Sequence, residues 1–108
     1  MGKSIVGSII AVRFPFSDLS SAKLRPALVL AEAEFGNLIV CQITSKTYTS
    51  KSAVKITPSD TSGMLRESYI RPDKIFTAAP EIVSRELAKL DTRKHVLVRD
   101  HLRILLGL

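Results

Sequence analysis

The sequence predicts a mainly β fold in which a small, strongly bent, barrel-like sheet is closed by one C-terminal helix. Short apolar and β-branched runs recur along most of the 108-residue chain, and clusters of Gly, Pro, Ser and Asp separate them. A helical spacing of apolar residues appears near the C-terminus, where Val98, Leu102 and Leu105 fall near one face. The length suits a single domain over residues 1–108, and no repeat or linker interrupts it.

The first strand is predicted over residues 8–14, because this stretch is apolar and β-branched and Pro15 interrupts a hydrogen-bonded ladder. Residues 16–24 then form a loop of small polar residues with one aromatic residue, Phe16, and one cation, Lys23. This loop is either an ordinary connection with Phe16 packed in the core, or a flap from which Phe16 or Lys23 contacts a ligand.

The next two strands form the central feature of the chain. The runs ALVLAEA at 27–33 and NLIVCQIT at 37–44 are predicted to pair as an antiparallel hairpin, with Gly36 in the turn. Arg25 precedes the first run and Thr44 ends the second. The start of one antiparallel strand lies beside the end of the other, so we expect Arg25 and Thr44 to meet at one rim of the sheet.

This rim has the chemistry of a phosphate-binding site. Thr44 is followed by Ser45 and Lys46, which adds a second hydroxyl and an ammonium to the guanidinium of Arg25. A guanidinium binds phosphate through a planar fork, and hydroxyl groups bind its remaining oxygens. The residues after this rim, SKTYTSKS at 45–52, interleave the cations Lys46 and Lys51 with Tyr48. That combination suits single-stranded nucleic acid, although an ordinary solvated loop fits the same sequence.

A fourth strand is predicted at 53–56, and it ends at a cluster of turn residues. A further hairpin is predicted with strands at 64–70 and 74–77 and a corner at residues 71–73. Together with the three strands before them, these give five to six short strands. This number suits a small closed or nearly closed sheet rather than a flat one.

The last part of the chain contains the predicted helix. Residues 81–90 fit either a short helix or a last strand. Asp91-Thr92 is a helix N-cap signal, and a helix is predicted over 93–106 with a glycine directly after it. His95 and His101 lie six residues apart on this helix, so they point in different directions and cannot share a metal ion. We expect each histidine at the surface or at the end of the helix.

Composition and charge restrict the function classes. The chain is 45% hydrophobic and 24% charged, as is typical of a globular domain. Its net charge of +6 favours polyanionic partners, although a solvated basic surface fits the same charge. Cys41, the single cysteine, lies in an apolar run and is expected in the core. We expect no cofactor and no metal, because the sequence has no phosphate-loop, dinucleotide or metal-ligand motif. No signal peptide or membrane span is visible, so we expect a cytoplasmic protein without a membrane partner.

The chain contains several short motifs in a defined order: IIAVRFPFSDL at 9–19, Arg25-Pro26, QITSK at 42–46, SYIRPDKIFT at 68–77, KLD at 89–91 and LRILLGL at 102–108. Their order and spacing resemble the PemK/MazF family of toxin endoribonucleases. The resemblance covers nearly the whole chain, and Ser8 stands where family members often carry Asp. The family's catalytic arginine maps to Arg25 and not to Arg71 of the second Arg-Pro dipeptide, which we expect to pair with Asp73 or Glu67.

This resemblance implies an SH3-like barrel and the toxin of a type II toxin-antitoxin system. It further implies metal-independent, sequence-specific cleavage of single-stranded RNA to 2′,3′-cyclic phosphate and 5′-hydroxyl ends, with Arg25 and Thr44 as catalytic residues. A guanidinium stays protonated, so Arg25 suits charge stabilisation or proton donation, and the base stays open. The implied partners are a second copy, in a homodimer, and an acidic antitoxin. The expected RNA-binding residues are Phe16, Lys23, Ser45, Lys46, Tyr48 and Lys51.

Two other functions fit the same sequence. One is a gyrase-binding toxin of the CcdB type, which resembles this family in fold but does not cut RNA. The other is a non-catalytic RNA-binding relative, for which the basic charge matters and Arg25 does not. A gyrase binder does not need Arg25 beside Thr44, and a non-catalytic relative would retard RNA in a gel without cleaving it.

Overall fold

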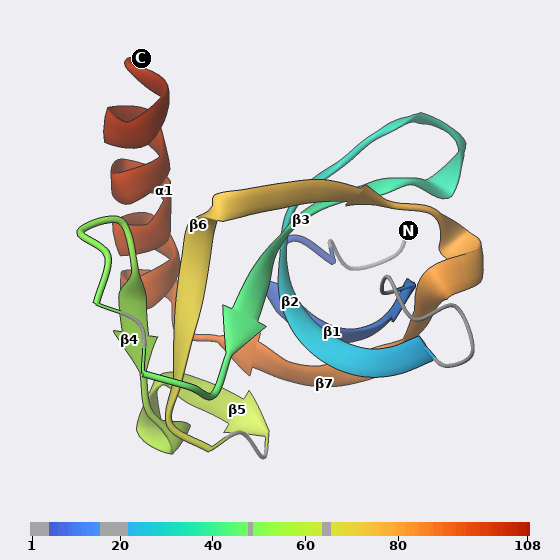
Figure 1. Ribbon diagram of the computed structural model, residues 1–108, viewed down its shortest axis with the longest axis horizontal. Coiled ribbons are helices and arrows are strands. Elements are labelled where there is room, and N and C mark those ends of the chain that lie inside the picture. Colours follow the sequence, from blue (N-terminus) through green and yellow to red (C-terminus); the bar gives the residue numbers. More distant parts are fainter. Residues whose placement is uncertain (1–4, 16–21, 48, 64–65) are drawn as a thin grey trace.

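The computed structural model describes residues 5–15, 22–47, 49–63 and 66–108. Seven antiparallel strands form one sheet in the order β4-β6-β3-β2-β1-β7-β5, which confirms the predicted mainly β fold. Figure 1 shows this sheet curling round on itself, with the helix α1 standing at one side next to β4 and β6. The elements are β1 (Ser8–Pro15), β2 (Ala22–Glu32), β3 (Leu38–Thr44), β4 (Val54–Ile56), β5 (Thr61–Gly63), β6 (Ser68–Ala78), β7 (Val83–Leu90) and α1 (Thr92–Leu106).

The predicted central hairpin is confirmed. Strands β2 and β3 are antiparallel, with Ala27 opposite Gln42 and Leu28 opposite Cys41. Its turn holds Phe35 and Gly36 with φ angles of 63° and 76°, and Phe35 is 89% exposed at the tip. Gly36 adopts this conformation without the steric penalty that a side chain brings.

The predicted corner at residues 71–73 is wrong. These residues lie inside β6, which continues unbroken from Ser68 to Ala78. Strand β3 pairs with β6 on both sides of the expected corner, with Gln42 opposite Arg71 and Cys41 opposite Ile75. The register shift between these two pairs leaves Pro72 in a bulge, where proline costs no ladder hydrogen bond.

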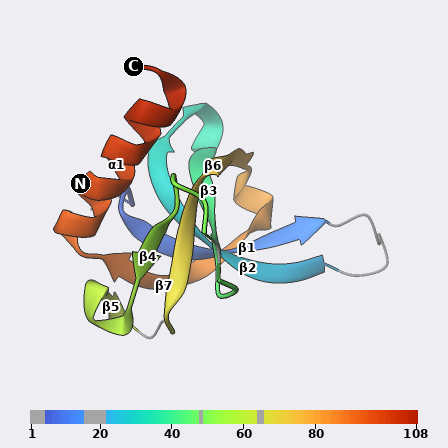
Figure 2. The ribbon, with the colours of Figure 1, turned by 60° about the vertical axis from the view of Figure 1, so that its left-hand side comes forward.

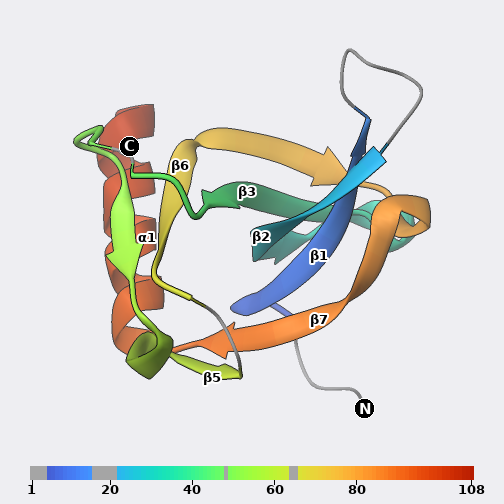
Figure 3. The same ribbon diagram turned by 60° about the horizontal axis from the view of Figure 1, so that its bottom comes forward.

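The sheet has seven strands in the described residues, one or two more than the predicted five to six. Residues 81–90, which fit either a helix or a strand, form β7 after a short 3-10 turn at Pro80–Ile82. Strand β7 pairs with β1 along one edge and with the three-residue β5 along the other. Figure 3 shows β7 and β5 completing the curl of the sheet below the N-terminal strand.

The sheet has a core on each face, and α1 covers one of them. Neighbouring residues of β1 belong to different cores: Ile9 packs in a cluster that includes Val98 of α1, and Ile10 packs in the cluster enclosed by the curl. A strand that is buried on both faces has a nearly continuous run of apolar residues in its sequence. Cys41 lies in the helix-side core, fully buried as predicted. Burial, and then the charge of Asp73, raises the pKa of the Cys41 thiol to about 12, so the thiol stays protonated.

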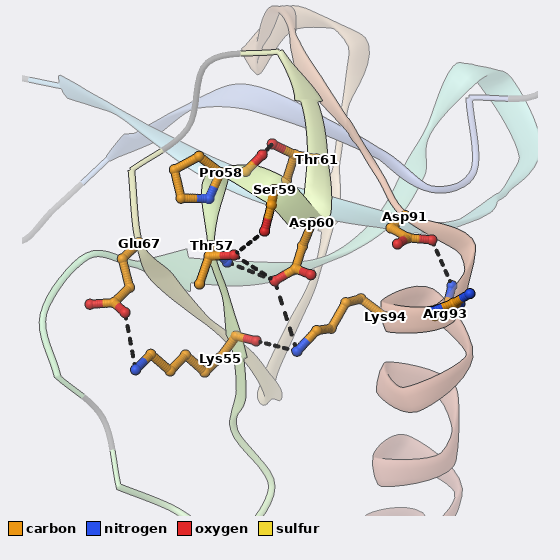
Figure 4. A network of polar contacts seen from close by, with 10 residues as sticks. All are labelled: Lys55, Thr57, Pro58, Ser59, Asp60, Thr61, Glu67, Asp91, Arg93 and Lys94. Carbon is orange, nitrogen blue, oxygen red and sulfur yellow. Dashed lines mark hydrogen bonds and ion pairs between the residues drawn. The ribbon is translucent and has the colours of Figure 1, made fainter.

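The C-terminal helix begins and ends as predicted. The Asp91 carboxylate accepts a hydrogen bond from the Arg93 N–H at 3.1 Å, and Gly107 ends the helix with a left-handed φ of 74°. A network at the start of α1 then ties it to the β4 side of the sheet (Figure 4). Lys94 Nζ donates to the Lys55 carbonyl at 3.0 Å and lies 3.9 Å from Asp60 Oδ2.

Asp60 is the acceptor at the centre of this network. Its Oδ2 accepts the Thr57 N–H at 2.8 Å and the Thr57 hydroxyl at 3.1 Å. The Thr57 N–H, followed by the Thr57 hydroxyl and the Lys94 ammonium, lowers the pKa of Asp60 against the opposing effect of burial. Asp60 therefore stays ionised and links the turn before β5 to α1.

Candidate functional site

A cavity of about 460 Å³ lies at the rim where β2 begins and β3 ends. Four separate parts of the chain meet there: the start of β2, the end of β3, the segment before β6, and β7. Figure 2 shows the first half of β2 running past the end of β3. The residues that line the cavity are Lys23, Leu24, Arg25, Pro26, Ile43, Ser45, Arg66, Ser68 and Leu87.

The charge of this cavity selects anions. Its described lining contains three cations, Lys23, Arg25 and Arg66, and no carboxylate. Two hydroxyl side chains, those of Ser45 and Ser68, complete the polar part of the lining. Converging guanidinium, ammonium and hydroxyl groups bind a phosphate with charge-assisted hydrogen bonds. A partly enclosed site strengthens this attraction, because water screens it less.

Arg25 and Thr44 lie at the same end of neighbouring strands. Each is two residues beyond the last pair of the β2–β3 ladder, Ala27 opposite Gln42. Arg25 is half-buried and lines the cavity. Thr44 lies between two residues that line it, and its hydroxyl accepts the Lys46 N–H at 3.2 Å. Thr44 itself is not among the described residues that line the cavity.

The other sequence-predicted site residues divide into three groups. Lys23 and Ser45 line the same cavity as Arg25. Lys46 is exposed next to the rim. Lys51 lies elsewhere, in a cavity of about 280 Å³ between the loop after β3 and α1, where Ile104 and Leu105 are also found. The structure therefore does not bring Lys51 into the cavity with Arg25. The two aromatic candidates, Phe16 and Tyr48, lie outside the described residues.

Six of the lining residues were not among the predicted site residues: Leu24, Pro26, Ile43, Arg66, Ser68 and Leu87. Leu24 lies beside Arg25 in the chain, but Arg66, Ser68 and Leu87 are at least 41 residues away from it. Nothing local marks these residues, because an arginine before a strand and a leucine within one are common everywhere. Strand pairing alone brings them to the rim: β6 lies beside β3, and β7 beside β1.

The second Arg-Pro dipeptide is engaged in an ion pair, as predicted. Arg71 holds Asp73 with Nη2–Oδ2 and Nε–Oδ1 distances of 3.1 and 3.4 Å. The other predicted partner, Glu67, pairs with Lys55 at 3.0 Å. The hydrogen bond to Glu67, and then the charge of Glu67, raises the pKa of Lys55.

Neither histidine lines the cavity that contains Arg25. The ring of His101 lies 3.0 Å from the Ser52 carbonyl and so links α1 to the loop before β4. His95 is half-buried against Gly7, where an added Cβ would lie 3.4 Å from its Nδ1. Its Nε2 is buried, with no hydrogen-bond partner among the described residues. His95 therefore lies near the start of α1, one of the two expected kinds of position, and is half-buried rather than at the surface.

This packing makes the fold sensitive to acid through His95. Burial, and then the charge of Arg99, lowers the pKa of His95 below its ordinary value near 6.5. In this pH range the unfolded chain binds a proton at His95 and the folded chain does not. The free energy of unfolding is therefore at its full value above the ordinary histidine pKa, and it falls as the pH drops toward the lower pKa of the folded state. We expect the thermal midpoint to fall between pH 7.5 and pH 5.5, and His95→Gln to reduce that fall. His101→Gln is the control and should keep it; an unchanged pH profile in His95→Gln would contradict the assignment.

Within the described residues, no three His, Cys, Asp or Glu side chains are grouped as a metal site would require. No described helix is both long and apolar enough to cross a bilayer.

Comparison with known proteins yields a match to a family model. Residues 6–106 match the family model for the PemK-like, MazF-like toxin of type II toxin-antitoxin systems. A comparison with curated proteins finds no significant match.

Three solved structures illustrate the similarity of fold. MazE-MazF (Form-II) from Deinococcus radiodurans superposes with a TM-score of 0.80 at 21% identity, covering 100% of this chain and 99% of that one. An endoribonuclease in complex with its cognate antitoxin, from a mycobacterial species, gives 0.79 at 16% identity with coverage of 98% and 97%. The Mycobacterium tuberculosis toxin MazF-mt6 gives 0.75 at 17% identity with coverage of 94% and 97%. At these identities the likeness concerns the fold.

Proposed function

This chain belongs to the family of PemK-like, MazF-like toxins of type II toxin-antitoxin systems, and we propose that it acts as an endoribonuclease on single-stranded RNA. The observation that carries the proposal is the cationic cavity at the start of β2, which Lys23, Arg25 and Arg66 line together. The similar structures from Deinococcus radiodurans and the mycobacteria, which are named MazF or endoribonuclease, support it further. Arg25 and Thr44 are the proposed catalytic residues.

The proposed reaction is attack of the RNA 2′-oxygen on the neighbouring phosphorus. The 2′-hydroxyl loses its proton as the P–O2′ bond forms, and the 5′-oxygen gains a proton as the P–O5′ bond breaks, so the products carry a 2′,3′-cyclic phosphate and a 5′-hydroxyl. Negative charge builds up on the non-bridging oxygens during this step, and the guanidinium of Arg25 stabilises it. A guanidinium remains protonated, so Arg25 is not the base that accepts the 2′-hydroxyl proton. Thr44 positions a phosphate oxygen by its hydroxyl.

The side chains that line the cavity themselves provide positive charge for the phosphate. We therefore propose that cleavage needs no metal ion. RNA incubated with the protein in excess EDTA should be cut as fast as in Mg²⁺. The new 5′ ends should accept phosphate from polynucleotide kinase without prior phosphatase, and the 3′ ends should resist phosphatase until acid opens the cyclic ester. Cleavage that stops in EDTA and returns with Mg²⁺ would contradict the proposal. RNA that is retarded in a gel but stays intact at high protein concentration would identify a non-catalytic binder.

We also propose a homodimer and an acidic antitoxin as partners. The end of α1 exposes apolar side chains, among them Ile104 at 73%, Leu106 at 56% and Leu108 at 81%, and a second copy is one partner that covers such a surface. For the cationic cavity, the fitting inhibitor is a partly disordered acidic segment that folds on binding and places carboxylates where phosphates bind. The mycobacterial endoribonuclease similar in fold is named as a complex with its cognate antitoxin.

Expression of this chain alone should therefore arrest growth, and co-expression of the neighbouring small open reading frame should relieve the arrest. The reason is that an unrestrained nuclease destroys cellular RNA, whereas a bound acidic segment blocks the cavity. Arg25→Ala is the matched control and should permit growth without the second reading frame. Light scattering of the purified chain should give the mass of a dimer. A monomer, or normal growth during expression alone, would remove the support for a toxin.

A further inference from the structure

We propose that Arg66, Leu24 and Leu87 form a nucleotide subsite beside Arg25, in which Arg66 binds an RNA phosphate other than the one being cleaved and the two leucines receive its base. This inference rests on the proposed function and adds to it the residues that hold the substrate strand. It concerns the part of the cavity that the sequence does not mark.

The fold holds the backbone of Arg66 at the rim. Tyr69 of β6 pairs with Thr44, and the strands are antiparallel, so the residues before β6 extend past the end of β3. Ser68 is 2% exposed and its hydroxyl donates to the Arg66 carbonyl at 2.9 Å. The backbone of Arg66 is therefore held in place, while its side chain is exposed and lines the cavity.

The lining of the cavity also contains apolar residues. Leu24 is 52% exposed, and Leu87 is partly buried against the helix-side core. Pro26 and the fully buried Ile43 complete the apolar part of the lining. A bare anion gains nothing from apolar side chains, whereas a nucleobase buries its face against them and gains hydrophobic contact. A cavity lined by both apolar residues and three cations therefore suits a nucleotide better than a free phosphate.

The size of the cavity agrees with this reading. Its volume of about 460 Å³ falls within the span of roughly 300–1,000 Å³ that is typical of small-ligand sites. Three cations in one cavity exceed the need of a single phosphodiester, which carries one negative charge. Arg25 is assigned to the scissile phosphate, so Arg66 is available for a neighbouring phosphate of the same strand. A strand held at two points enters the reaction in a defined orientation.

Binding without cleavage tests the subsite directly. The probe is a fluorescein-labelled, mixed-sequence single-stranded RNA with 2′-O-methyl groups, which lack the attacking hydroxyl, and anisotropy is measured in EDTA over a range of salt concentrations. Arg66→Ala should weaken binding about tenfold at low salt and make the log-log salt slope shallower by about 0.7, the value for one lost phosphate contact. Arg66→Lys should keep the slope. Leu24→Ser should weaken binding severalfold without changing the slope, because it removes apolar contact and no charge.

Arg103→Ala is the matched control, since Arg103 is an exposed arginine on α1 that pairs with Asp100 and does not line the cavity. It should leave affinity and slope unchanged. The subsite is refuted if Arg66→Ala behaves like Arg103→Ala, if Leu24→Ser has no effect, or if the unchanged chain does not bind the probe.

Cleavage of ordinary RNA separates this inference from the proposed function. Arg66→Ala should raise KM about tenfold with kcat within about twofold, because its contact is made equally in the ground state and the transition state. A chain that binds through Arg66 but cuts no RNA would overturn the proposed function and leave the subsite standing. A chain that cuts RNA, with Arg66→Ala unchanged in KM and salt slope, would overturn the subsite alone.

Discussion

Replacing Arg25 with alanine is expected to lower the rate of RNA cleavage by about 100-fold or more, the usual loss for one preorganised charge contact to the transition state. The guanidinium is half-buried at the start of β2, where the pairing of β2 with β1 holds its backbone: Arg25 lies opposite Val12. A charge fixed in this way needs no reorganisation when the phosphate becomes more negative. Most of the loss should appear in kcat, since the contact strengthens as the charge develops.

Two further variants refine this result. Arg25→Lys keeps a point charge but loses the planar fork, so it should recover only part of the rate. Thr44→Ala should cost about tenfold, because one neutral hydrogen bond is weaker than one to a charged group. Circular dichroism should show every variant folded, and Arg103→Ala should cut RNA normally. Near-normal cleavage by Arg25→Ala, together with its loss in His101→Gln, would show that the site is elsewhere.

Replacing Gly63 with alanine is expected to reduce the free energy of unfolding by about 3 kcal/mol, from backbone strain and steric overlap together. Gly63 ends β5 with a φ of 124°, a conformation that residues with a side chain rarely adopt. An added Cβ would lie 2.7 Å from the Leu87 carbonyl oxygen and 3.0 Å from Ala88 Cα, both in the backbone of β7. Backbone atoms of a paired strand cannot rotate away, so β5 must separate from β7.

Gly107→Ala is the matched control for this substitution. Gly107 also has a positive φ, 74°, but an added Cβ there meets no heavy atom of the described chain within 4 Å. It should lose only the cost of the left-handed conformation, about 1 kcal/mol. Urea unfolding with a common m-value measures both variants. Equal losses would show that backbone conformation alone, and not the approach of β7, explains the glycine at position 63.

Some of the fold could be predicted from the sequence because its signals are local. The β2–β3 hairpin follows from two apolar runs around Phe35 and Gly36, and α1 follows from the Asp91 cap and the Gly107 stop. Each depends on residues within one turn or one hairpin. Cys41 was placed in the core for the same reason, since its immediate neighbours are apolar.

The strand β6 could not be predicted in this way. Arg71-Pro72-Asp73 has the composition of a turn, and only hydrogen bonding to β3 on both sides of it keeps the strand continuous. The sequence of residues 81–90 fits either a helix or a strand. Pairing with β1 and β5 makes this segment the strand β7. Pairing between distant strands overrides weak local preferences, because a ladder of hydrogen bonds outweighs a propensity of a few tenths of a kcal/mol.

The same distinction between local signals and long-range pairing applies to the candidate site. That Arg25 and Thr44 lie at the same end of β2 and β3 could be expected from the sequence, because a hairpin joins these two antiparallel strands. Arg66 and Leu87 reach that rim through β6 and β7, whose places in the sheet depend on partners far away in the chain. Lys51 shows the converse, because it follows the rim closely in sequence and yet lies against α1. Residue types and their order thus identify the chemistry at one rim, whereas the curl of the sheet determines which further side chains share its cavity.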